Sequence, residues 1–92
     1  MSTEDQSTET PMDFNTFIMS LSTSALLHMG ALPDAEGIEK NLPMAKHTID
    51  CLAMLEDKTK GNLSGEEERL LNEVLYDLRM RFVSASKDDA DA

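Results

Sequence analysis

The chain lacks the residue types on which several kinds of small protein depend. Its 92 residues include no tryptophan, one tyrosine and three phenylalanines, so a core must use aliphatic side chains and some of the seven methionines. Cys51 is the only cysteine, which excludes a disulfide within the chain. No segment approaches the ~18 consecutive apolar residues of a membrane-spanning helix. The acidic start, without a charged and then apolar run, is not expected to be a secretory signal.

Basic residues are also scarce. Eight Lys and Arg stand against 18 Asp and Glu, which gives a net charge of −10 at pH 7. Nucleic acids and anionic lipids bind basic surfaces, so this acidity argues against both as partners. Arg69, Arg79 and Arg81 all fall in the last predicted helix, but three residues are too sparse for a surface that tracks phosphates. We therefore expect a cytoplasmic protein with no nucleic-acid partner, no membrane partner and no cofactor.

The two ends of the chain have the composition of disordered tails. Residues 1–11 contain no large apolar residue after Met1, and residues 84–92 contain none. Such segments bury too little surface to offset backbone ordering at roughly 1–2 kcal/mol per residue. We expect acidic disordered tails at 1–12 and 84–92, on either side of a helical domain at 13–83.

Apolar periodicity predicts a first helix at about 14–29, between an N-cap at Asp13 and a stop at Gly30. One stripe of this helix holds Phe14, Phe17, Ile18, Leu21, Ala25, His28 and Met29. Met19 and Leu26, seven positions apart, form a second apolar patch. The helix has no charged residue, whereas a surface helix normally carries charge on its wet side. It is therefore expected to have little wet surface.

Two further helices are predicted, at about 42–60 and 65–83. Asn41 is placed to cap the earlier one, and Pro43 falls in its first turn, where the missing N–H costs nothing. Its apolar residues spread over roughly half its circumference, more than one packing partner needs. The apolar stripe of the later helix consists of Leu71, Val74, Leu75, Leu78 and Phe82. The sequence thus predicts an all-α fold of three helices.

The segment DKTKGNLSGEEERLL, residues 57–71, is interpreted as a structural corner and not as a ligand-binding loop. Gly61 falls where a helix ends in the left-handed conformation, and Leu63 follows where such an ending places its apolar contact. Ser64 and Glu67 have the spacing of a capping box, which starts the next helix. So short a connection predicts that the last two helices form an antiparallel hairpin.

Three segments together carry a resemblance to a known family: DFNTFIMSLSTSALLHMG, NLPMAKHTIDCLAMLEDKTKGNL and EEERLLNEVLYDLRMRFV. With these segments the chain resembles the bacterial family called domain of unknown function 1844, over residues of about 13–83. The resemblance implies a bacterial, all-helical, cytoplasmic protein. The family has no assigned activity, so the resemblance implies no catalytic or binding residues.

The residues with the most reactive side chains are His28, His47 and Cys51. His47 and Cys51 are four positions apart in one predicted helix and could share a metal ion with His28, but such a set is a weak signal without a second cysteine. His28, in the last turn of its helix, would need a nucleophile and an orienting carboxylate to act as a base. A small enzyme or metal-binding protein is the alternative hypothesis; we favour structural roles for all three.

Two other patterns allow two interpretations each. The hydroxyl residues Ser20, Ser22, Thr23 and Ser24 suit either a close helix contact or an exposed surface. The methionines at 12, 19, 29, 44, 54 and 80 suit either an adaptable binding surface or gap-filling in a core poor in aromatics. We favour gap-filling for the methionines and leave the hydroxyl residues open.

The leading hypothesis is a non-catalytic helical interaction or scaffold protein that self-associates as a dimer or a larger homo-oligomeric bundle. A domain at 13–83 falls in the size range in which one core rarely supplies more than ~3–5 kcal/mol, and no disulfide supports it. Pairing through the uncharged first helix would bury its surplus apolar surface. The expected interface residues are Phe14, Phe17, Met19, Leu21 and Leu26. The sequence names neither the number of subunits nor a further protein partner.

Overall fold

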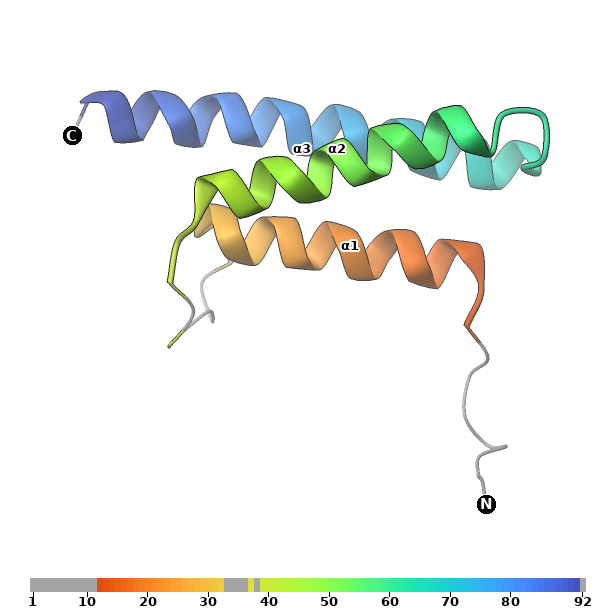
Figure 1. Ribbon diagram of the computed structural model, residues 1–92, viewed down its shortest axis with the longest axis horizontal. Helices are drawn as coiled ribbons and strands as arrows, with labels where there is room; N and C mark the ends of the chain where they lie inside the picture. Colours follow the sequence, from red (N-terminus) through yellow and green to blue (C-terminus); the bar gives the residue numbers. More distant parts are fainter. Residues whose placement is uncertain (1–11, 33–36, 38, 92) are drawn as a thin grey trace, which may run out of the picture.

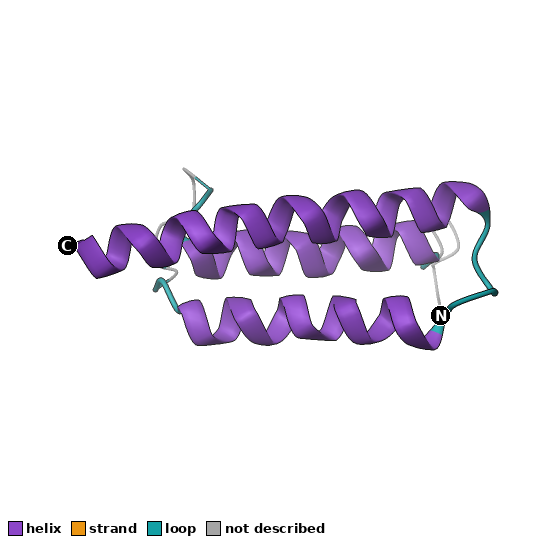
Figure 2. Cartoon of the chain, turned by 90° about the horizontal axis from the view of Figure 1, so that it is seen from above, coloured by secondary structure: helices purple, strands orange, loops and turns teal. Residues whose placement is uncertain are grey.

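The protein is an all-α bundle of three helices, as predicted. The computed structural model describes residues 12–32, 37 and 39–91, with the side chains of 89–91 excepted. The helices are α1 (Phe14–Met29), α2 (Leu42–Lys58) and α3 (Gly65–Asp91), and no strand occurs within those ranges. Figure 1 shows the helices lying side by side, and Figure 2 shows the same arrangement from above. None of the described helices has the length and apolarity needed to cross a membrane.

Helices α1 and α2 begin at the residues that the sequence indicates. At the start of α1 the Asp13 carboxylate accepts a hydrogen bond of 2.7 Å from the Thr16 N–H, and in α2 the Asn41 side chain accepts one of 3.1 Å from the Met44 N–H. Hydrogen bonds from the backbone and hydroxyl of Thr16 hold the pKa of Asp13 below its ordinary value. The stability contributed by this cap is therefore lost as the pH falls through that lowered pKa.

The core lies along the common axis of the three helices. It consists of Ile18, Ala25, Met29, Ala45, Ile49, Leu52, Leu71, Val74, Leu75 and Leu78. All but Ala45, Ile49 and Leu52 come from the apolar stripes predicted for the first and third helices, and these three come from the apolar side of α2. Ala25 and Ala45 have no exposed surface, and such small side chains let neighbouring helices approach closely. Each helix thus buries one apolar side in a single interior.

The later helix ends differ from the predicted ones. Helix α2 ends at Lys58 and not near residue 60, and α3 continues to Asp91, beyond the predicted end at 83. The prediction of a disordered tail from residue 84 is therefore wrong for residues 84–91, which are helical, whereas the tail predicted at 1–12 lies outside the described residues except for exposed Met12. Helix propagation gains one hydrogen bond for each added residue, and residues 84–91 contain no glycine or proline to stop it.

Figure 1 shows the last part of α3 extending past the ends of α1 and α2. It also shows the chain reversing after α2, so that α3 runs back beside it.

Candidate functional site

The connection between α2 and α3 is built from local hydrogen bonds. Gly61 has a φ of 84°, in the left-handed region, and the Asn62 N–H donates to the Thr59 carbonyl at 2.8 Å. Ser64 and Glu67 form a reciprocal pair: the Ser64 N–H donates to the Glu67 carboxylate at 2.9 Å, and the Glu67 N–H donates to the Ser64 hydroxyl at 3.1 Å. Leu63 is half-buried and packs against the core. These bonds satisfy the free backbone groups at the start of α3.

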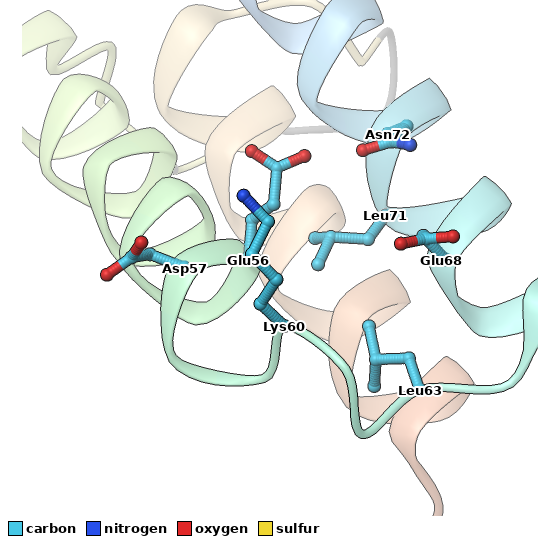
Figure 3. A pocket seen from close by; sticks show the side chains of 7 residues that line it. All are labelled: Glu56, Asp57, Lys60, Leu63, Glu68, Leu71 and Asn72. Atoms are coloured by element: carbon cyan, nitrogen blue, oxygen red, sulfur yellow. The ribbon is translucent and has the colours of Figure 1, made fainter.

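A hollow of about 370 Å³ lies beside this connection. It is lined by Glu56, Asp57, Lys60, Leu63, Glu68, Leu71 and Asn72. Figure 3 shows Leu71 between side chains of α2 and side chains of α3. Leu71 is buried and Leu63 is half-buried. The Asp57 carboxylate points away from the other labelled side chains. The hollow is therefore lined by polar side chains and by two leucines.

The chemistry of this hollow is limited to charge and hydrogen bonding. Its lining provides carboxylates, one ammonium group and one amide, and it contains no serine, threonine, cysteine or histidine. These lining residues therefore do not assemble a hydroxyl or thiol nucleophile with a neighbouring histidine. Over the part of the chain that the structure describes, no group of three or more His, Cys, Asp or Glu side chains is arranged to hold a metal ion.

Two glycines near the corner provide a matched test of its backbone. A Cβ added at Gly61 or at Gly65 would meet no atom within 4 Å, so crowding is not at issue. Gly61 has positive φ, and Gly61→Ala is expected to lower the free energy of unfolding by about 1–2 kcal/mol because of backbone strain. Gly65 begins α3 and does not have positive φ. Gly65→Ala is therefore expected to raise the free energy of unfolding by up to about 1 kcal/mol.

Chemical denaturation of the two alanine variants beside the unchanged protein measures both effects. Shifts of the same sign would contradict the conformation assigned to the corner.

The structure does not join His28, His47 and Cys51 into a site. His47 is exposed and Cys51 is half-buried, both on α2. His28 is half-buried in the last turn of α1, where its backbone carbonyl accepts a hydrogen bond of 2.7 Å from the Asn41 N–H. Its Nδ1 atom is buried and has no hydrogen-bond partner among the described residues. No hydrogen bond connects the three side chains in the described part of the chain.

The five residues expected at a self-association interface divide into two groups. Phe14, Leu21 and Leu26 are half-buried and pack against the core. Phe17 and Met19 are 40% and 48% exposed, so they remain available to another surface. They are two positions apart and therefore lie on opposite sides of the outer surface of α1.

Between Phe17 and Met19 the outer surface of α1 includes exposed hydroxyl residues. The Ser20 hydroxyl donates to the Thr16 carbonyl at 3.0 Å, and the Thr23 hydroxyl donates to the Met19 carbonyl at 3.0 Å. Ser22, by contrast, is buried in the bundle. Both interpretations of the hydroxyl run therefore apply, to different residues. The exposed hydroxyls bond to their own helix and have little need of water.

The methionines are mostly surface residues, and the preferred sequence interpretation of them as core gap-fillers is wrong. Only Met29 of the six considered is buried, and the exposed ones are Met12, Met19, Met44, Met54 and Met80. Sequence reasoning also overlooked Tyr76 and Val83, which are 69% and 64% exposed on α3. Their signal was present: Tyr76, Met80 and Val83 are spaced four and three apart and so share one side of the helix.

Comparison with known protein families gives a match over most of the chain. The family described as Domain of unknown function (DUF1844) matches residues 11–84, which include α1, α2 and most of α3. No curated protein and no solved structure is significantly similar to the chain. The match covers the whole described bundle except the last turns of α3, and the chain belongs to the DUF1844 family.

Proposed function

We propose that the chain is a non-catalytic helical interaction protein that acts in the cytoplasm and associates with further copies of itself through α1. The proposal rests on the outer surface of α1. This helix carries no charged side chain over its 16 residues, in a chain with a net charge of −10. Two copies that approach through α1 bring their acidic residues together less closely than through α2 or α3, both of which carry carboxylates.

The exposed side chains of α1 suit a contact between two helices. Phe17 and Met19 provide apolar surface on either side of Thr16, Ser20 and Thr23, which are small. Small residues at a crossing point allow two helix axes to approach to about 8 Å. Because the hydroxyls of Ser20 and Thr23 already donate within α1, covering them leaves neither hydroxyl donor unpaired. The buried core of each copy would remain as it is.

Cross-linking between copies tests this arrangement directly. In a Cys51→Ser background, Ser20→Cys places one thiol at the centre of the outer surface of α1. Two such thiols across a symmetric contact should come within the Cα separation of about 4.4–6.8 Å that a disulfide requires. Mild oxidation should therefore yield a disulfide-linked dimer, which non-reducing electrophoresis detects.

Glu73→Cys in the same background is the matched control, because Glu73 is exposed on α3. It should remain mostly monomeric under the same conditions. Equal cross-linking of the two variants, or none at Ser20→Cys, would contradict association through α1.

A further inference from the structure

A second surface, between α2 and α3, has features of a binding site for another protein. A groove of about 360 Å³ runs between α2 and α3 and is lined by Lys46, Ile49, Asp50, Arg79, Phe82 and Val83. Its apolar walls are formed by Ile49, Phe82 and Val83, while charged side chains stand at its edges. No residue of α1 lines it. The groove is thus separate from the surface proposed for self-association.

Apolar surface continues from this groove along the outer side of α3. Val83 lines the groove and also shares one side of the helix with Met80 and Tyr76. Met80 is 56% exposed, and its flexible thioether adapts to partners of different shape. Contiguous exposed apolar surface of this kind on a charged helix indicates a place where another molecule binds.

The charged residues that line the groove have a positive sum, whereas the net charge of the chain is negative. Lys46 and Asp50 form an ion pair of 3.1 Å, so they neutralise each other. Arg81, on the same helix as Arg79, pairs with Asp77 at 2.8 Å. Arg79 itself makes no ion pair within the described residues. The edge of the groove is therefore locally positive, although the chain carries a net charge of −10.

We propose that this groove binds an amphipathic helix of a partner protein, with apolar side chains that enter the groove and acidic side chains beside them that pair with Arg79. A groove between two helices accepts the ridge of a third helix, and such partners are held by anchors at positions i, i+3 or i+4, and i+7. An acidic partner helix would be repelled by the rest of this acidic chain. The positive charge of Arg79 therefore directs the helix to the groove and fixes its orientation there.

Two synthetic helical peptides of about 18 residues, or five turns, test the proposal. Both carry leucines at anchor spacing, and they differ only in flanking residues, which are glutamates in one and lysines in the other. Methyl NMR spectra of the full chain should show saturable shifts of Ile49 and Val83 with the glutamate peptide and weaker binding of the lysine peptide. Equal affinity for the two peptides, or shifts confined to α1, would overturn the proposal.

Charge-reversal variants separate the groove from the rest of the surface. Arg79→Glu should weaken binding of the glutamate peptide at least about tenfold, because it places like charges together. Arg69→Glu makes the same change on an exposed residue ten positions earlier in α3, about 15 Å away, and should leave affinity within about twofold. Equal effects of the two variants would show only a general effect of net charge and would contradict the proposal.

Two further variants distinguish other occupants. Val83→Asp alters an exposed groove wall and should abolish peptide binding without unfolding the chain. If dilution without peptide shifts the groove resonances, and Val83→Asp removes that shift, the groove holds a second copy and the proposal fails. Phe17→Glu combined with Met19→Glu, outside the groove, should leave peptide binding unchanged, so this proposal can fail or hold independently of self-association through α1.

Discussion

Replacing Leu52 by alanine is expected to lower the free energy of unfolding by about 2–5 kcal/mol. Leu52 has no exposed surface, and it lies in the core that all three helices share. The substitution removes buried methyl groups and leaves a cavity that the neighbouring side chains fill only partly. Since a core of this size rarely supplies more than ~3–5 kcal/mol, the variant should lose most of its folded population unless association adds stability. Urea unfolding followed by far-UV circular dichroism measures the change.

Two controls separate the loss of packing from a general effect of substitution on α2. Leu52→Met nearly conserves volume and should cost less than about 1.5 kcal/mol. Met54→Ala, two positions later at an exposed residue, should change the free energy by no more than about 0.5 kcal/mol. If Leu52→Ala were as mild as Met54→Ala, the side of α2 assigned to the core would be wrong.

A second large effect is expected from Phe17→Glu combined with Met19→Glu, which should weaken self-association by about a hundredfold or more. Each new carboxylate would have to lose its water in an apolar contact, which costs roughly 1.4 kcal/mol or more of binding free energy. Each such cost raises the dissociation constant about tenfold, so the two together raise it about a hundredfold. Both residues are exposed on the single chain, so the variant should stay folded. Leu26 is unsuitable for this test because it packs against the core. Sedimentation velocity over a concentration series reports the dissociation.

Met54→Glu is the matched control, because Met54 is 50% exposed on α2 and lies outside α1. It introduces one charge of the same kind, and it should leave the concentration dependence of sedimentation unchanged. Association of the double variant as tight as that of the unchanged protein would exclude α1 as the interface.

Much of the fold could be predicted because its signals are local. Asp13 and Asn41 accept capping hydrogen bonds from residues three positions later, a geometry that depends only on the helix start. Gly30 and Gly61 have positive φ, which follows from the low cost of that conformation for glycine. The core stripes of α1 and α3 follow from helical periodicity. None of these features requires knowledge of how the helices pack.

The features that sequence reasoning missed depend either on tertiary packing or on the lack of a signal that ends a helix. Helix α3 continues as far as Asp91 because residues 84–91 contain no glycine or proline. By composition alone, an acidic segment without large apolar residues instead looks disordered. The exposure of Met80 and Val83 depends on which side of α3 faces its neighbours. The groove beside Arg79 exists only where α2 and α3 meet, so neither helix shows it by itself.

The mass of the protein in solution tests the central claim, self-association, most directly. Sedimentation equilibrium of the full chain at low micromolar concentration gives this mass without reference to shape. The account predicts a folded species of two or more chains, with a mass that is a multiple of 10.2 kDa. A stable species of 10.2 kDa with the helical circular dichroism of the folded chain would contradict it.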